Sequence, residues 1–592
     1  MKRKANIFIA IMLVFSAFAF SACGKSGDPD GGGTTQTIDR TKEQIYVSVY
    51  DGGTGTQWIK EEAEKFNASL DKYQVYIIEG KSSASNIIDE VSAGSNIASA
   101  YFSVDTAFQE LIYTDKLVDL SPILEKKIGG ETRTVGDKLK NKESWLQLAS
   151  KNGSGCYLLP YSDSVGGLVF DYDDFVQNGW LNYADGKDET VTAALTGQGI
   201  VFENQNGKLF YTSGGSDVYY EAGERIMTAG KDGKFGTYDD GQPQTVAEWN
   251  HMLGKIKGEH GAYPFIWPGD FLNYTGMIQN AVFAQLAGIE AFENYFAFDS
   301  EGQPVLLKDG SEKVITPENG YDYFQMKEIY QTIEFMSTYF TSDNAHPVTK
   351  GNTSHFDAQK NYLYAPVSEG KIPLAAMICE GIWWENEARK DSFPQVEAMD
   401  SDRGYGKRDY RFMLIPYLDG QKGIDGNGGG SVIAGQDTGS FFVVKEKNAE
   451  KTEILLDFLS QTLSDECLEK FTTETGVIRA YDYTISEENF AKMTPFSQNV
   501  WKMYNDSENI AIVRPFQERL KAPVVFATDI SLEGVVFPFN DNGKIMGSDT
   551  CVVSYLAKNK TVSEIFNMVK DSFSATSWSR YMARAKEQGF YS

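Results

Sequence analysis

Residue types on which metal and nucleophilic catalysis depend are scarce in this chain of 592 residues, which has four histidines and five cysteines. The histidines are dispersed, without an HExxH pair or any other metal-ligand spacing, which argues against the known zinc-hydrolase patterns. A Gly-x-Ser-x-Gly nucleophile elbow and a complete phosphate-binding loop are also missing. The sequence therefore carries no catalytic signature that can be recognised from residue spacing.

Positive charge is also in short supply. The chain has 55 Lys and Arg against 82 Asp and Glu, which gives a formal net charge of −27. Nucleic-acid binding needs clustered cations that release counterions from phosphates, so this balance argues against a nucleic-acid partner. It argues equally against electrostatic attachment to a membrane surface. Apolar residues make up 41% and aromatics 13%, enough for folded cores, and the length suits at least two packed units.

Four of the five cysteines are far apart and lack CxxC spacing: Cys156, Cys379, Cys467 and Cys551. A disulfide scaffold would be denser, and a chain of this size does not need one. The pattern is compatible both with one or two bridges and with buried free thiols.

The N-terminal segment is typical of an export signal. Positive charges at Lys2–Lys4 precede the apolar run Ile7–Phe20, which is shorter than a bilayer span. Phe20-Ser-Ala-Cys23-Gly resembles the lipobox of bacterial lipoproteins, although Phe20 stands where these usually carry Leu; a plain secretory signal is the alternative. The resemblance implies a signal peptide over 1–22 and a lipidated (palmitate-bearing) Cys23. The protein would then be anchored to the outer face of the cell membrane.

Residues 23–39 are rich in Gly, Ser, Thr and Asp, which predicts a flexible tether. No second apolar segment approaches transmembrane length, so the expected contact with the bilayer is through Cys23 alone.

The body of the chain opens with a βαβ pattern. Ile45–Tyr50, Gln74–Glu79 and Ala98–Val104 are expected strands, separated by amphipathic helical segments. Such units form parallel sheets that bind ligands at the carboxyl ends of the strands. The loops after Tyr50 and Ser103 are therefore candidate binding loops. Residues from about 181 to 241, rich in Gly, Asp and Thr, suggest an insertion.

Tryptophans at the ends of apolar strands are the most informative residues. Trp383 and Trp384 follow an apolar strand that carries Glu380, and Trp267 follows another and precedes Asp270. A Trp ring can cover the apolar face of a pyranose while carboxylates take its hydroxyls, so this combination suits a sugar. The alternative is that these rings belong to the core.

An acidic loop suggests one ion. Asp232, Asp239 and Asp240 flank glycines and a threonine, and such hard oxygen donors suit calcium. The loop lacks EF-hand spacing, and an ordinary acidic turn is the alternative. We therefore expect no required cofactor, with structural calcium at this loop as the one candidate.

Several segments in a fixed order carry a family resemblance. The most specific is SEGKIPLAAMICEGIWW (368–384), which matches a Gly-Lys-x-Ala-Met…Gly-x-Trp pattern. The others are IYVSVYDGGTGTQWIKEEAEKFN (45–67), ASAYFSVDTAFQELIYTDKLVDLSP (98–122), CYLLPYSDSVGGLVFDYDDF (156–175), FMLIPYLDG (412–420), TGSFFVVKEKNAEKTEILLDFL (438–459) and TGVIRA (475–480). In this order the chain resembles the extracellular solute-binding proteins of ABC importers, in the sugar-binding branch that contains maltose-binding protein.

The resemblance implies an α/β, two-lobed periplasmic-binding-protein type II fold with hinge crossovers and a ligand cleft between the lobes. Lobe 1 would comprise 40–163 and 438–480, and lobe 2 would comprise 164–437 and 481–592. The protein would be a monomer that closes over a carbohydrate, with an oligosaccharide expected, and delivers it to ABC permease subunits without chemistry.

The resemblance also implies a set of ligand-binding residues: Tyr50, Asp51, Ser103, Asp105, Ser162, Asp163, Trp267, Asp270, Glu380, Trp383 and Trp384. Ser103 stands where maltose-binding protein has a Trp, so one stacking platform is absent and the identity of the sugar does not transfer. Three other functions stay open: a cell-surface glycan hydrolase or lyase with a carboxylate pair, a peptide-binding receptor of the same transport class, and an adhesion or scaffold lipoprotein.

Overall fold

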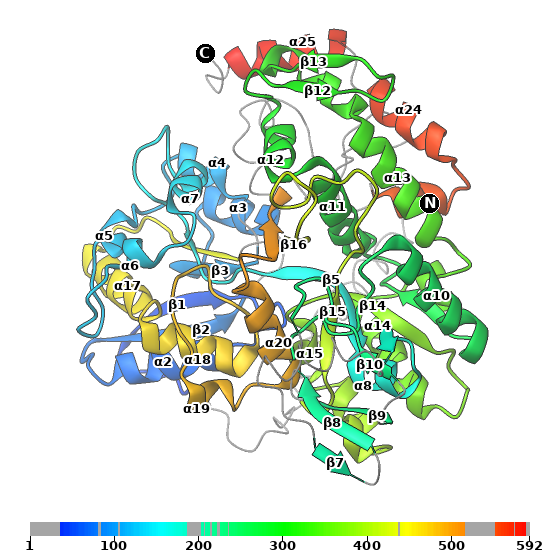
Figure 1. The fold of residues 1–592 in the computed structure, drawn as a ribbon. Helices are drawn as coiled ribbons and strands as arrows, with labels where there is room; N and C mark the ends of the chain where they lie inside the picture. The colour runs from blue at the N-terminus through cyan, green and yellow to red at the C-terminus, as the bar shows by residue number, and fades with distance from the viewer. Residues whose placement is uncertain are drawn as a thin grey trace, which may run out of the picture. The chain divides into compact units, whose positions relative to one another are not determined.

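Two mixed β-sheets organise the chain (Figure 1). The computed structural model describes residues 36–80, 84–104, 107–185, 203–205, 208–213, 216–221, 225–234, 236–435, 439–515, 551–572 and 575–587. The chain divides into Met1–Thr37 and Ile38–Ser592, and the elements below belong to the second unit. Cys23 and the predicted signal peptide lie outside the described residues.

The first sheet has five strands in the order β2-β1-β3-β17-β4. Their bounds are β1 (Glu43–Val49), β2 (Tyr73–Glu79), β3 (Ala100–Ser103), β4 (Leu159–Pro160) and β17 (Ser440–Val443). β1 pairs in parallel with β2 and β3, as the strand–helix–strand pattern predicts. β17 is antiparallel to both of its neighbours, because it enters the sheet from the opposite direction. The sheet is therefore mixed.

Helices from both ends of the sequence cover this sheet. Trp58 on α2 (Gln57–Asn67) lies with its ring centroid 6.0 Å from Phe102 and 4.9 Å from Phe471. Phe471 belongs to α18 (Asp465–Thr475), which appears beside α2 in Figure 1. The apolar face of α2 that the sequence predicts is thus buried partly against a segment about 400 residues later, which no local pattern specifies.

The second sheet has the strand order β11-β14-β5-β16-β18, with β15 also paired to β5. The bounds are β5 (Val165–Asp171), β11 (Tyr263–Ile266), β14 (Ala375–Gly381), β15 (Tyr410–Met413), β16 (Ser431–Gly435) and β18 (Ile510–Val513). β11 and β14 are parallel, so the residues that follow them emerge at the same edge of the sheet. Every residue of β14 is buried.

Two short connections link the sheets. The chain passes from β4 in the first sheet to β5 in the second, and later returns from β16 to β17. Tyr161–Ser164 form the first connection, where the sequence pattern indicated a hinge crossing. One cluster of buried apolar side chains surrounds the first sheet and continues over one face of the second, where it includes Ile378 and Ile433. The other cluster, with Met377 and Val432, covers the opposite face of the second sheet.

The remaining helices surround the two sheets. The α-helices are α3 (Ala84–Ala93), α4 (Gln109–Tyr113), α5 (Ser121–Leu124), α6 (Val135–Lys138), α7 (Lys142–Ala149), α8 (Tyr172–Gln177), α10 (Val246–His260), α11 (Asn273–Ala287), α12 (Ile289–Ala297), α13 (Lys327–Tyr339), α14 (His355–Tyr364), α15 (Trp384–Ala388), α16 (Ser392–Glu397), α17 (Ala449–Gln461), α19 (Glu487–Phe490), α20 (Pro495–Tyr504), α23 (Val552–Leu556), α24 (Val562–Ser572) and α25 (Ala575–Glu587). The 3₁₀ segments are η1 (Pro317–Gln325), η2 (Pro347–Lys350), η3 (Ala365–Val367) and η4 (Ser401–Arg403). In the part of the chain that the structure describes, no helix combines the length and apolarity needed to cross a membrane.

Small antiparallel sheets occupy the region of the predicted insertion. β7 (Glu203–Gln205), β8 (Lys208–Ser213) and β9 (Ser216–Glu221) form one, and β6 (Tyr183–Asp185) pairs with β10 (Arg225–Met227). A further hairpin pairs β12 (Pro304–Leu306) with β13 (Glu312–Val314). Residues 186–202 and several short stretches up to 235 lie outside the described residues.

Candidate functional site

Two carboxylates share one amide donor where β14 ends. Glu380 is fully buried, and Gln359 on α14 donates through Nε2 to Glu380 Oε1 at 3.0 Å and to Glu387 Oε2 at 2.7 Å. Burial raises the pKa of Glu380 well above its usual value, and the neighbouring Glu387 raises it further. Gln359 Oε1 is itself buried and has no hydrogen-bond partner among the described residues. The Gly381 amide also donates to Glu380 Oε2 at 3.2 Å, and acceptors still outnumber donors in this network.

Trp383 lies beside this network. Its ring is partly buried and packs against both clusters of buried apolar side chains. Tyr274, near the start of α11, meets Trp383 edge-to-face with ring centroids 6.2 Å apart. Burial raises the pKa of Tyr274 well above its usual value, and Glu380, Glu387 and Tyr50 contribute. Tyr50 therefore lies near the group formed by Tyr274, Glu380 and Trp383.

Trp384 is a core residue, which corrects our expectation that it belongs to the ligand-binding set. It is fully buried, with its ring centroid 5.0 Å from Tyr410 and 5.8 Å from Phe393. Successive residues at the start of a helix point in different directions, so only one of the two tryptophans can face the strand ends. Trp384 takes the opposite direction and fills the space between α15, α16 and β15.

The loop after β1 reaches this group from the first sheet. Asn386 Nδ2 donates to the carbonyl oxygen of Gly53 at 2.6 Å. Gly53 has φ +78°, and a Cβ built there would lie 2.9 Å from Trp383 Cβ, so a side chain does not fit. Asp51 Oδ1 accepts from the Gly55 amide at 2.8 Å, which shapes the same loop. The loop thus contacts α15 through its main chain.

The loop after β11 carries the remaining aromatic group. Trp267 is 3% exposed, its ring lies 6.0 Å from Phe340, and its Nε1 has no hydrogen-bond partner among the described residues. The Asp270 side chain is exposed, and its amide donates to Thr353 O at 3.0 Å. Trp267 therefore packs in the apolar interior beside Phe340, where its Nε1 donor is unsatisfied. Asp270 lies at the surface.

Most of the predicted ligand-binding residues near the first sheet already make contacts within the protein. Ser103 is fully buried at the end of β3, and Ser162 Oγ accepts from the Gly439 amide at 3.1 Å. Asp163 accepts from Arg514 Nε at 2.8 Å and also from Tyr504 Oη. Burial alone would raise the pKa of Asp163, but the Arg514 guanidinium holds it below its usual value. Asp105 lies outside the described residues.

A cavity of about 720 Å³ adjoins the Asp163–Arg514 ion pair. Its lining includes Lys140, Trp145, Phe292 and the end of β18. The cavity therefore lies next to the first connection between the sheets, and Asp163 is a wall residue whose carboxylate is already neutralised.

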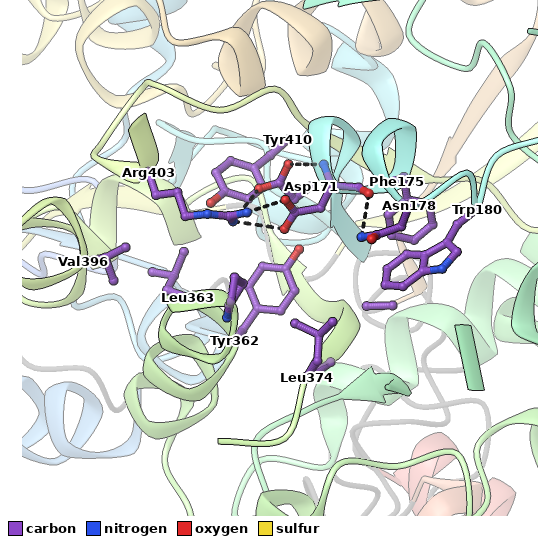
Figure 2. A pocket seen from close by; sticks show the side chains of 14 residues that line it. Asp171, Phe175, Asn178, Trp180, Tyr362, Leu363, Leu374, Val396, Arg403 and Tyr410 are labelled. Carbon is purple, nitrogen blue, oxygen red and sulfur yellow. Dashed lines mark hydrogen bonds and ion pairs between the residues drawn. The ribbon is translucent and has the colours of Figure 1, made fainter. Parts of the chain in front are cut away.

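A second cavity, drawn in Figure 2, is much smaller at about 20 Å³, room for about one water molecule. Asp171 and Arg403 point toward each other at its edge, beside Tyr362 (Figure 2). Arg408 donates to both oxygens of Asp171 at 2.9 Å. Burial, with Asp174 nearby, raises the pKa of Asp171 to about 7. This cluster is a buried ion-pair network with no space for a sugar.

The acidic loop uses its carboxylates internally. Asp239 Oδ2 accepts from the amides of Lys231 at 2.6 Å and Asp232 at 3.1 Å, and Asp240 Oδ2 accepts from the Gly236 amide at 2.8 Å. Burial, reinforced by Asp239, raises the pKa of Asp232 to about 7. Within the described residues, no group of three or more His, Cys, Asp or Glu is arranged to hold a metal ion. Calcium binding at this loop stays a prediction.

The thiols of Cys156, Cys379, Cys467 and Cys551 are free and buried. Of the two alternatives that the sequence left open, the structure therefore has free thiols at these four positions.

Comparison with known proteins identifies the fold. No protein-family model and no curated protein matches the chain. A solved structure from a study of xylan utilisation by Caldanaerobius polysaccharolyticus matches with a TM-score of 0.53 at 13% identity, over 90% of this chain and 100% of the other. The chain has the periplasmic-binding-protein fold. This confirms the predicted fold class, and the family resemblance at the level of the fold.

Other solved structures match less well. The cyclic α-maltosyl-1,6-maltose binding protein of Arthrobacter globiformis has a TM-score of 0.48 at 11% identity, over 91% of this chain and 99% of the other. A Streptococcus pneumoniae solute-binding protein in complex with the blood group A-trisaccharide has a TM-score of 0.46 at 14% identity, over 89% and 99%.

Within the periplasmic-binding-protein fold, four contributors to the site were missed by sequence reasoning: Tyr274, Gln359, Asn386 and Glu387. Asn386 and Glu387 follow Trp383 by one helical turn, a spacing that could have drawn attention to them. Gln359 lies on α14, and no local sequence pattern indicates that this helix packs against β14.

Proposed function

We propose that this chain is the substrate-binding lipoprotein of an ABC importer, and that it captures an oligosaccharide between its two sheets. The observation that carries the proposal is the group at the end of β14. An incompletely buried Trp ring stands beside two carboxylates, an amide and a tyrosine, and a main-chain loop from the other sheet closes on it. Aromatic faces with nearby acceptors are what pyranose rings require.

Two features of the site support capture without catalysis. Glu380 and Glu387 are bridged by one amide, so they do not stand on opposite sides of an open space where a glycosidic bond could lie. The contact between Gly53 and α15 belongs to elements of different sheets, so separating them would open the site. We expect the ligand to bind to the open arrangement and to stabilise the closed one, which the importer permease would recognise.

The anchor is part of the same proposal. We infer export, cleavage before Cys23, lipidation of that cysteine and a position on the outer face of the membrane, from the resemblance of residues 20–24 to a lipobox. The described body is expected to act as a monomer. Mass spectrometry of the membrane-extracted protein should show a diacylglyceryl group on Cys23, and an unmodified Cys23 would contradict the anchor.

A calorimetric and thermal-shift titration of the chain from residue 38 onward against mono- to hexasaccharides tests the binding function. We expect saturable binding of at least one neutral oligosaccharide, with that ligand recovered intact by chromatography. Released shorter sugars would favour the glycan-hydrolase alternative. Saturable binding of peptides alone would favour the peptide receptor, and no small ligand at all would favour an adhesion or scaffold role.

A further inference from the structure

An exposed aromatic group lies close to the candidate site. Phe271 is 39% exposed and Phe356 is 44% exposed, although both are large apolar side chains. The His355 ring contacts both of them, with its centroid 5.6 Å from Phe271 and 4.1 Å from Phe356. We name Phe271, His355 and Phe356 the rim cluster. Exposed aromatic side chains that gather in this way are typical of binding surfaces.

The rim cluster is continuous with the site at the end of β14 by two independent routes. On one route, His355 Nε2 lies 3.5 Å from Glu387 Oε1, and the Glu387 amide donates to Trp383 O at 2.9 Å. On the other, the Tyr274 amide donates to Phe271 O at 3.1 Å, and the Tyr274 ring meets Trp383. Both routes make Trp383 and the rim cluster near neighbours, linked through Glu387 on one route and through Tyr274 on the other.

The chemistry of this surface suits a neutral sugar. The Phe271 and Phe356 rings offer apolar faces, and the His355 and Glu387 side chains, 24% and 14% exposed, offer polar atoms between them. The hydroxyl groups of a sugar can donate to the partly exposed Glu387 carboxylate. The carboxylates of Glu387 and Asp270 would repel a uronic or sialic acid.

We propose that the rim cluster is a second sugar subsite, which holds a neutral pyranose unit of the same chain whose neighbouring unit lies at Trp383. The inference rests on the proposed function and deepens it, because it makes the ligand an oligosaccharide that extends outward over α14. A monosaccharide would occupy the Trp383 side alone. A longer ligand gains affinity from the rim, where the exposure of Phe356 leaves room for the chain to continue.

The test is a glycan array that contains mono- to hexasaccharide series of neutral and acidic sugars, followed by calorimetry on the glycans that bind. It compares the wild type with the double variant Phe271→Ala/Phe356→Ala. The double variant Phe271→Tyr/Phe356→Tyr retains both rings and is the matched control. Met399→Ala removes a side chain that is 61% exposed two residues after the end of α16, and it controls for the loss of exposed apolar surface in general.

The alanine double variant should lose roughly tenfold in affinity for the longer glycans, with the affinity for the shortest bound member unchanged. The tyrosine and Met399 variants should match the wild type, and all melting temperatures should be similar because the side chains are exposed. Equal affinity of the wild type and the alanine variant at every length would overturn the second subsite while leaving the proposed function intact. Preferential binding of acidic glycans would also overturn it. A wild type that binds no glycan on the array would overturn both.

Discussion

On the first-sheet side of the candidate site, each carboxylate has a partner of its own, whereas on the second-sheet side two carboxylates share one side-chain amide. Asp51 accepts from the amide of its own loop, and Asp163 is paired with Arg514. Glu380 and Glu387 instead share the amide of Gln359. The pKa of Asp163 is lowered, while that of Glu380 is raised. A lowered pKa means that the ionised carboxylate stabilises the folded state, and a raised pKa means that its ionisation destabilises the folded state.

The difference suggests a division of roles between the two sides. The first-sheet side supplies the hinge and a main-chain loop, so its side chains are used for structure. The second-sheet side supplies the aromatic ring, together with an acceptor, Gln359 Oε1, and a donor, Trp267 Nε1, that the described residues leave unsatisfied. Substitutions on the first side should therefore change stability, and substitutions on the second should change binding.

The largest expected effect separates the two adjacent tryptophans. Trp384→Ala should reduce the free energy of unfolding by about 3–5 kcal/mol, because it empties a buried aromatic cluster. Trp383→Ala should cost much less stability but should weaken oligosaccharide binding at least about tenfold. Urea denaturation and calorimetry on both variants check this. If Trp383→Ala destabilises the protein as much as Trp384→Ala and binds ligand normally, the assignment of roles is reversed.

Removing the hinge ion pair should cost nearly as much. Asp163→Ala leaves the Arg514 guanidinium buried without its carboxylate, and about 3 kcal/mol of stability should be lost at pH 7. Since the pKa of Asp163 is lowered in the folded state, its contribution is present above the unfolded pKa of about 3.9 and disappears as the pH falls through the folded value. The difference in unfolding free energy between the variant and the wild type should therefore shrink below pH 4.

The matched control for this experiment is Asp51→Ala, which removes a carboxylate from an exposed loop. Its cost should be below about 1 kcal/mol at any pH. A pH-independent difference between Asp163→Ala and the wild type would show that packing, and not the charge of the pair, dominates at this hinge.

The sequence predicts the βαβ start and the importance of the β14 end, because the first depends on local periodicity and the second on a strand followed by a turn. Glu380 and Trp383 could be found for that reason. Asp163 and Trp384 could be placed near the site but not assigned roles, since Arg514 and Phe496 reach them from distant parts of the chain. Gln359 could not be found, because only tertiary packing brings α14 to β14.

On the second-sheet side, we expect the substitution Glu380→Gln to raise the stability of the fold and to weaken ligand binding. Because burial and Glu387 raise the pKa of Glu380, its ionisation opposes folding increasingly as the pH rises above the unfolded pKa of about 4.3. Glu380→Gln removes this cost while its amide oxygen still accepts from Gln359. Stability at pH 8 should rise by at least about 1 kcal/mol, the equivalent of one pKa unit, and should not change at pH 4. Urea denaturation at both pH values measures this, and calorimetry should show weaker ligand binding. Equal or lower stability of the variant at pH 8 would contradict the conclusion that ionisation of Glu380 opposes folding.

The smallest expected effect tests the point where the two sides meet. Gly53 and Gly55 both have positive φ, +78° and +69°, but a Cβ at Gly53 would lie 2.9 Å from Trp383 Cβ, whereas one at Gly55 would meet nothing within 4 Å. Alanine at either position should cost about 1 kcal/mol of backbone strain. Only Gly53→Ala should also push the loop away from α15, weaken the Asn386 hydrogen bond and lower ligand affinity a few-fold. Small-angle scattering should then show a larger radius of gyration for Gly53→Ala than for Gly55→Ala. Identical scattering and affinity of the two variants would mean that this loop can close on Trp383 without its main-chain contact.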